Sequence, residues 1–202
     1  MIVIGIDPHK RQHTAAALDR LTQRHCDSLA IEADLAGYRR LLAWAKRWPE
    51  RTWAVENARG LGQHLAQWLL ARGETVVDVP ATATRRVREL SRGGRRKNDV
   101  IDAAAAASIA ALHGDATTVD IEDITVVLAL LDERRVNLAQ QRVRLVNQLH
   151  ALLRDLVPGG APAQLTADQA AALLRGVQPM TAVDTQRKQL SRELVADLRR
   201  LD

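Results

Sequence analysis

Hydrophobic residues in the first half of the chain form short apolar runs separated by stretches with one apolar face. The run at 2–6 has no polar side chain, as expected for a strand buried on both faces. Two further segments, 13–18 and 25–31, are joined by a polar turn and predict an antiparallel meander with the first. Strands are also predicted at 51–55 and 75–79, and helices at 34–48, 60–71, 81–90 and 99–113. This order predicts an α/β fold with helices on both faces of a mixed five-stranded sheet, three antiparallel strands followed by two parallel ones.

A different pattern begins near residue 120, where apolar residues recur every seven positions in two series three residues apart. This heptad pattern reaches residue 156 and predicts one long helix in a coiled coil, interrupted at Arg135 and Arg142. One interpretation is self-association into a dimer or tetramer, and the simpler one is a helix that packs within its own chain. The residues expected to join two copies are Ile124, Leu128, Leu131, Leu138, Leu145, Leu149 and Leu152.

The expected domain organisation follows from this change of pattern. The chain has 202 residues, enough to bury a full hydrophobic core. Proline and two glycines at 158–160 end the long helix, and shorter helices are predicted at 166–175 and 181–201. We therefore expect an α/β domain over 1–118, a coiled-coil helix over 119–157 and a helical extension over 158–202.

Four carboxylates stand near the ends of the predicted elements. Asp7 and Glu56 each follow an apolar strand, and open α/β sheets bind ligands at the carboxyl ends of their strands. Asp99 and Asp102 share one face of the predicted helix, because residues three apart are neighbours there. If the first and fourth strands are adjacent, all four carboxylates can meet at one edge and hold Mg²⁺, or Mn²⁺ in its place, for phosphodiester chemistry. In the simpler alternative, Asp7 and Glu56 only cap the ends of strands, and Asp99 and Asp102 only lie at a solvent-exposed helix N-terminus.

Positive charge is concentrated in one segment. The net charge is +5, and residues 85–97 hold seven arginines and lysines against one acid, Glu89. Such a local patch favours contacts to a nucleic-acid backbone more than the total charge does. The residues expected to contact nucleic acid are Lys10, Arg85, Arg86, Arg88, Arg92, Arg95, Arg96 and Lys97.

Composition excludes several classes of protein. Cys26 is the only cysteine, so neither an intrachain disulfide nor a cysteine-based zinc site can form. No apolar run approaches the length that spans a membrane, and the opening apolar run is too short for a signal peptide. We therefore expect a cytoplasmic protein.

Four motifs, in order along the chain, resemble the DEDD transposases of bacterial insertion sequences, a family that includes the Piv-type DNA invertases and the RNA-guided bridge recombinases. The resemblance covers roughly residues 1–155, and Asn98 stands where the family often has threonine. The motifs are Gly-Ile-Asp-Pro-His-Lys at 5–10, Ala-Val-Glu-Asn-Ala-Arg-Gly-Leu-Gly at 54–62, Val-Asp-Val-Pro-Ala at 77–81 and Lys-Asn-Asp-Val-Ile-Asp-Ala at 97–103.

This resemblance implies a RuvC-like ribonuclease H fold, in which Asp7, Glu56, Asp99 and Asp102 hold magnesium. It also implies a coiled coil for multimerisation, DNA as substrate and, through the bridge recombinases, a guide RNA as a further partner. The family carries its nucleophilic serine in a second, C-terminal domain, and none of the serines here lies in a region that resembles it. On its own the chain is therefore not expected to complete recombination.

Other functions remain open on the sequence. A Holliday-junction endonuclease would use a metal-activated water, would need no serine and would suit the length of the chain. A non-catalytic module for assembly and nucleic-acid binding would use the basic segment and the heptads alone. An actin-like ATPase also begins with a Gly-Ile-Asp strand, but no glycine-rich phosphate loop follows.

Overall fold

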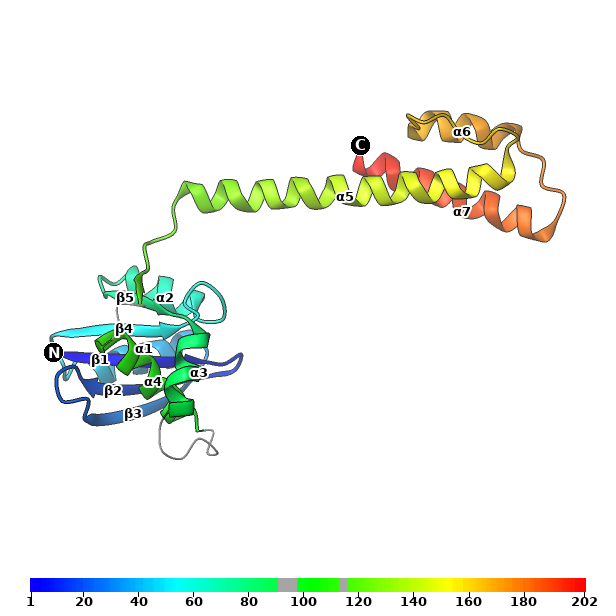
Figure 1. Cartoon of the computed structure of the whole chain (residues 1–202). Helices are drawn as coiled ribbons and strands as arrows, with labels where there is room; N and C mark the ends of the chain where they lie inside the picture. The colour runs from blue at the N-terminus through cyan, green and yellow to red at the C-terminus, as the bar shows by residue number, and fades with distance from the viewer. Residues whose placement is uncertain (91–97, 113–115) are drawn as a thin grey trace. The chain divides into compact units, whose positions relative to one another are not determined.

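The structure of the protein is a computed structural model that describes residues 1–90, 98–112 and 116–202, without the side chains of 88–90. The chain divides into two units, an α/β unit (Met1–Glu122) and a helical unit (Asp123–Asp202). Figure 1 shows the elements of each unit. Among the described helices, none combines the length and hydrophobicity that a membrane-spanning segment needs.

Six strands form one sheet within the described part of the α/β unit, in the order β3-β2-β1-β4-β5-β6. β1 is antiparallel to β2, which is antiparallel to β3, whereas β1, β4 and β5 are mutually parallel. The predicted five strands and the adjacency of the first and fourth are confirmed. The sixth was not predicted, because two exposed threonines at the sheet edge carry no apolar pattern. The strands are β1 (Ile2–Pro8), β2 (Gln12–Asp19), β3 (His25–Glu32), β4 (Arg51–Glu56), β5 (Val76–Val79) and β6 (Thr117–Thr118).

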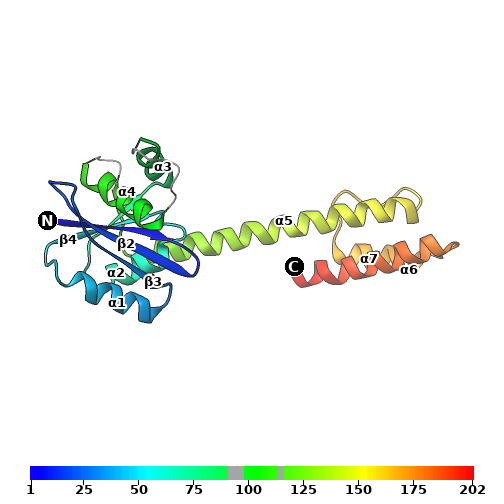
Figure 2. The ribbon, with the colours of Figure 1, turned by 90° about the horizontal axis from the view of Figure 1, so that it is seen from below.

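Helices cover both faces of this sheet, as Figure 2 shows. α1 (Leu35–Ala45) and α2 (Gln63–Leu70) lie on one face, and α3 (Ala81–Leu90) and α4 (Asp99–Leu112) lie on the other. Side chains of β1 alternate between the two cores. Ile4 and Ile6 pack with residues of α1 and α2, whereas Val3 packs with Ala103 and Ala107 of α4.

The helical unit consists of α5 (Ile124–Leu156), α6 (Ala167–Gly176) and α7 (Ala182–Leu201). Asp123 caps α5 by accepting a hydrogen bond from the Thr125 backbone N–H at 2.8 Å. The ion pairs Arg142–Asp202 and Arg187–Asp155 show that α7 runs antiparallel to α5. The long helix that the heptad pattern predicted over 119–157 corresponds to α5.

The second half of the heptad seam is occupied within the chain. Leu149 is fully buried in a core with Leu153, Leu174, Val195 and Leu198 of its own chain. The heptad pattern had instead placed Leu149 at the contact between two copies. A heptad shows that a helix has an apolar stripe but not which helix covers it, and here α6 and α7 do so. The other predicted interface residues divide into the half-buried Leu138, Leu145 and Leu152 and the exposed Ile124, Leu128 and Leu131.

Candidate metal centre

Asp7 lies near the carboxyl end of β1, beside Thr14 of β2, and is only 7% exposed. The alternation along β1 directs its side chain to the face that α4 covers. Its Oδ2 atom is buried and has no hydrogen-bond partner among the described residues. Burying a carboxylate oxygen without a donor costs free energy, and a cation bound there would remove that cost.

α4 brings Asp99 and Asp102 to this end of the sheet. Asn98 caps the helix, because its Oδ1 accepts from the Val100 N–H at 3.0 Å and its carbonyl accepts from the Asp102 N–H at 3.1 Å. Asparagine and threonine are both good N-cap residues, so the departure from the common threonine leaves the cap intact. Asp99 is half-buried and Asp102 is 5% exposed, both in the first turn, where negative charge is favoured.

Gly5 allows α4 to approach β1 closely enough to place these carboxylates. A Cβ atom on Gly5 would lie 1.8 Å from the carbonyl oxygen of Ala103 and 2.6 Å from the backbone nitrogen of Ala107. The helix backbone therefore packs directly on the strand, and the alanine-rich face of α4 permits this contact. As a result Asp7, two residues after Gly5, lies near Asp102, one residue before Ala103.

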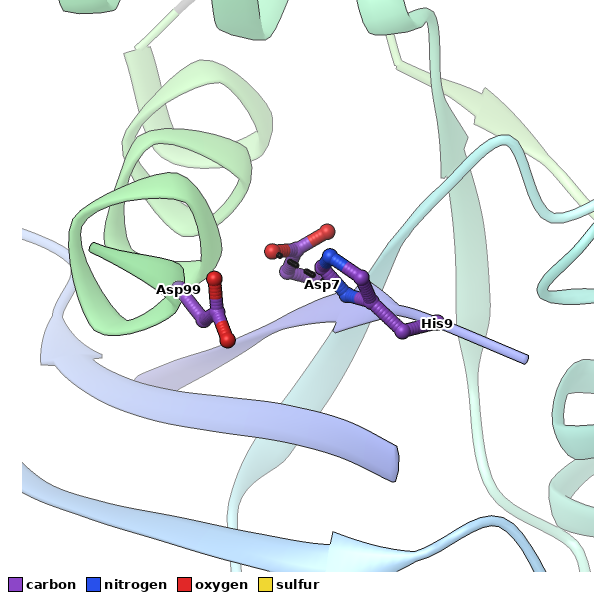
Figure 3. A group of neighbouring side chains, drawn as sticks. All are labelled: Asp7, His9 and Asp99. Carbon is purple, nitrogen blue, oxygen red and sulfur yellow. Dashed lines mark ion pairs between the residues drawn. The ribbon is translucent and has the colours of Figure 1, made fainter. Parts of the chain in front are cut away.

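His9 forms a group of three with Asp7 and Asp99 (Figure 3). One possible ligand atom from each side chain lies within 4.8 Å of the others. Nδ1 of His9 is 3.6 Å from Oδ2 of Asp7, an ion pair only when the imidazole is protonated. The sequence did not assign His9 to the site, because spacing alone does not show that the chain after β1 turns this side chain back. The signal for His9 in the sequence was its position two residues after Asp7, in an Asp-x-His motif.

Glu56, the fourth predicted carboxylate, is the last residue of β4, which lies between β1 and β5. Thr84 of α3 donates a hydrogen bond from Oγ1 to Oε1 of Glu56 at 2.8 Å. The turn after Glu56 is held by Asp78 of β5, whose Oδ1 accepts from the Ala58 N–H at 2.7 Å. The Thr84 contact had no signal in the sequence, since it depends on how a strand and a helix meet in space.

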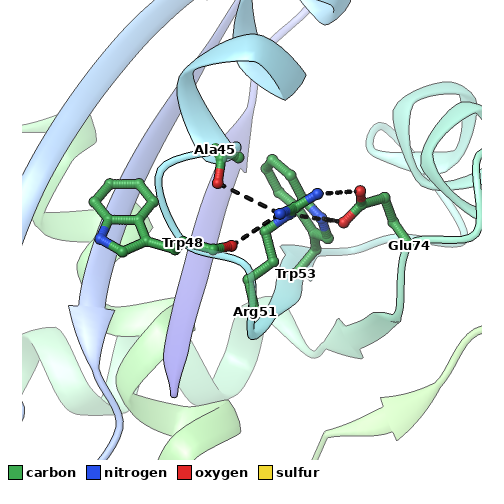
Figure 4. Close-up of polar contacts among 5 residues, drawn as sticks. All are labelled: Ala45, Trp48, Arg51, Trp53 and Glu74. Carbon is green, nitrogen blue, oxygen red and sulfur yellow. Dashed lines mark hydrogen bonds and ion pairs between the residues drawn. The ribbon is translucent and has the colours of Figure 1, made fainter.

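The opposite end of β4 is fixed by Arg51 (Figure 4). Its guanidinium donates to both carboxylate oxygens of Glu74 and to the carbonyl oxygens of Trp48, at 2.8 Å, and Ala45, at 3.4 Å. The indole N–H of Trp53 donates to the same carboxylate at 2.7 Å. These bonds join the end of α1, the start of β4 and the segment before β5, and so anchor the strand that ends at the site.

Burial raises the pKa of Asp7 from its ordinary 3.8 to about 6. The nearby His9 lowers this pKa, whereas the carboxylates of Glu56, Asp102 and Asp99 raise it. The other three predicted carboxylates are therefore close enough to Asp7 to interact with it electrostatically. Negative charges held together in this way repel one another, which favours either a proton or a bound cation.

The family model described as Transposase, for DEDD transposases of the IS110 type, matches residues 4–158. The chain belongs to this DEDD transposase family. A curated relative is the insertion element IS116 uncharacterized 44.8 kDa protein of Streptomyces clavuligerus, which is 31% identical over 209 residues. The match covers 96% of this chain and 52% of the relative, so the chain spans about half the length of the curated relative.

The α/β unit of this DEDD transposase chain has the mixed sheet with helices on both faces that the sequence predicted. Two solved structures of T. thermophilus RuvC are similar to the chain. The one in complex with Holliday junction substrate has 17% identity and a TM-score of 0.43, covering 59% of this chain and 99% of that one. The other has 15% identity and a TM-score of 0.45, covering 59% of this chain and 100% of that one.

Some of the predicted nucleic-acid contacts of the DEDD transposase chain can be placed. Lys10 is exposed two residues after β1 ends, and Arg85 and Arg86 are exposed on α3 directly after Thr84. Lys10 therefore follows the strand that carries Asp7, and the two arginines share a helix with Thr84, the hydrogen-bond partner of Glu56. Outside the described residues lie the side chain of Arg88 and the whole of Arg92, Arg95, Arg96 and Lys97.

Proposed function

We propose that this chain is the metal-binding part of a DNA transposase or site-specific recombinase, and that Asp7, Glu56, Asp99 and Asp102 hold Mg²⁺ at a DNA phosphodiester. The observation that carries this proposal is the buried Oδ2 of Asp7, which has no hydrogen-bond partner among the described residues, lies 3.6 Å from Nδ1 of His9 and belongs to a carboxyl group whose pKa three further carboxylates raise. Family membership supports the same activity.

The donor set suits magnesium. Mg²⁺ is a hard cation that is commonly held by carboxylates together with waters and substrate phosphates. When bound, it neutralises charge that develops on the attacking and leaving oxygens of a phosphodiester. His9 offers a nitrogen atom, a softer ligand that suits zinc, copper, iron or nickel better than magnesium. We therefore assign His9 to the edge of the site, where its imidazole can pair with Asp7 or with a substrate phosphate.

The chain's own residues position the substrate. Lys10, three residues after Asp7, is exposed, as are Arg85 and Arg86 directly after Thr84, and exposed cationic side chains hold a phosphate backbone without reading its sequence. Complete strand transfer is assigned to a longer assembly, because the chain spans about half of its relative. Ser191 is fully buried and donates to the Arg187 carbonyl oxygen at 2.8 Å, which supports a structural role for this serine.

The proposal includes two kinds of partner, further copies of the chain and a guide RNA. Exposed apolar residues on the first half of α5, among them Ile124, Leu128 and Leu131, support self-association of the chain into a dimer or tetramer. Lys10, Arg85 and Arg86 would bind the phosphates of a guide RNA as well as those of DNA, because contacts to phosphate do not distinguish RNA from DNA.

Calorimetric titration with Mn²⁺ tests the metal site. The wild-type chain is expected to show saturable binding, which Asp7→Asn and Asp102→Asn should each weaken by more than about a hundredfold, because an outer-shell partner alone is typically worth about 10- to 100-fold. Glu32→Gln removes an exposed carboxylate from β3 and should bind like the wild type. Equal weak heats in all four proteins would rule out the metal site.

Salt-dependent binding to duplex DNA tests the assignment of α3. A double variant, Arg85→Ala with Arg86→Ala, should weaken binding similarly on unrelated sequences and reduce the slope of log K against log salt by up to about 2, because each phosphate contact contributes about 0.9. The matched control is Arg39→Ala with Arg40→Ala, which removes the same charge from α1 on the other face of the sheet. Equal losses in both double variants would show an effect of net charge alone and would contradict the assignment.

A further inference from the structure

Thr84 lies where α3 begins above the carboxyl edge of the sheet. Val79, the last residue of β5, pairs with Glu56 in the parallel register, and Pro80 leads directly into α3. One helical turn later the chain returns over the end of β4. Thr84 is therefore 3% exposed, with its Oγ1 2.8 Å from Oε1 of Glu56 and 2.9 Å from the carbonyl oxygen of Ala81.

The hydroxyl of Thr84 has one proton for these two acceptors. A hydrogen bond to an ionised carboxylate is roughly twice as strong as one between neutral groups, so the proton goes to Glu56 whenever Glu56 is charged. The Ala81 carbonyl is in the first turn of α3 and can accept from the helix backbone instead. The contact therefore restricts where the Glu56 carboxylate can lie.

We propose that Thr84 is a positioning residue that holds Glu56 in place as a metal ligand, an inference that rests on the proposed function. The same contact ties α3 to the metal centre. Because Arg85 and Arg86 follow Thr84 directly, this hydrogen bond also sets where the cationic side chains of α3 stand relative to the carboxylates. A loss of the hydroxyl should consequently weaken metal binding while leaving the fold intact.

The test compares three variants by Mn²⁺ calorimetry and by thermal unfolding in chelator. Thr84→Val keeps the shape of the side chain but removes the hydroxyl, and should lower Mn²⁺ affinity about 10- to 100-fold, the usual cost of losing an outer-shell partner. Thr84→Ser keeps the hydroxyl and should bind within about threefold of the wild type. The matched control is Thr52→Val, the same change on the same face of β4, roughly 13 Å from Glu56 along the strand.

The two readouts separate positioning from simple stability. Lower affinity in Thr84→Val, with its melting temperature in chelator unchanged and affinity restored in Thr84→Ser, supports the proposal. Affinity equal to the wild type in Thr84→Val overturns it. A loss of both affinity and melting temperature that Thr84→Ser does not restore also overturns it, because Thr84 would then be structural only. Absence of Mn²⁺ binding by the wild type would instead contradict the proposed function.

Discussion

Alanine at position 5 is expected to destabilise the α/β unit by about 3 kcal/mol or more, at the upper end of the range for overpacked cores. The added methyl group would lie 1.8 Å from the carbonyl oxygen of Ala103, which is a backbone atom and cannot rotate away. Either α4 must move from the sheet or β1 must bend. Urea unfolding followed by tryptophan fluorescence measures the effect, because all four tryptophans lie in this unit.

Two further variants make the Gly5 test specific. Gly176→Ala adds the same methyl group at the end of α6, where it meets nothing within 4 Å, and should leave unchanged the urea midpoint measured by circular dichroism, which reports on the helices of both units. Adding Ala103→Gly to Gly5→Ala should not restore stability, because the clash is with the main chain and not with the methyl group of Ala103. A wild-type midpoint for Gly5→Ala would contradict the close packing of α4 on β1.

Asparagine at position 7 is expected to stabilise the metal-free α/β unit at pH 7. The ionised carboxylate of Asp7 is buried among other carboxylates, and its pKa is about 6 instead of the ordinary 3.8. The difference between these values corresponds to about 3 kcal/mol lost at pH 7, of which Asp7→Asn should recover about 1–2 kcal/mol because a buried amide also lacks partners. Urea unfolding in chelator measures the gain.

The pH dependence has a definite sign. Because the pKa of Asp7 is raised in the folded state, the folded chain binds more protons than the unfolded chain between about pH 3.8 and 6. Wild-type stability should therefore fall as the pH rises through this window, and the advantage of Asp7→Asn should shrink as the pH falls towards 4. An advantage that stays constant with pH would contradict the electrostatic explanation.

Metal should reverse the order of these two proteins. Mn²⁺ at a hundred times its dissociation constant for the wild type is expected to stabilise the wild type by about 2.7 kcal/mol and Asp7→Asn by less than about 0.5 kcal/mol. Asp19→Asn is the matched control, because Asp19 is only half-buried and hydrogen bonds from Thr22 lower its pKa. This variant should show no gain in chelator and the same response to Mn²⁺ as the wild type.

The parts of the site that the sequence predicted are those fixed by local pattern. Asp7 and Glu56 could be identified because each follows an apolar strand, and Asp99 and Asp102 because they begin an alanine-rich helix. Strand adjacency follows from the order of elements, so the convergence of the four positions could be inferred without coordinates. In the structure, the other three carboxylates lie close enough to Asp7 to raise its pKa.

The features that the sequence did not predict depend on contacts between distant segments. His9 approaches Asp7 and Asp99 only because of the path taken after β1. Thr84 reaches Glu56 only because β5 ends in register with β4, and this register is not encoded in the spacing of the two residues. Leu149 fits a heptad equally well whether its partner helix belongs to the same chain or to another.

The network of Arg51 and Glu74 has a consequence for engineering this protein. It lies at the amino end of β4, whereas the candidate ligand Glu56 lies at the carboxyl end, roughly 17 Å away along the strand. Substitutions separated by more than about 7–10 Å, with no shared partner, usually have additive effects. Thermal stability can therefore be improved at one edge of the sheet while the candidate metal ligands are altered at the other.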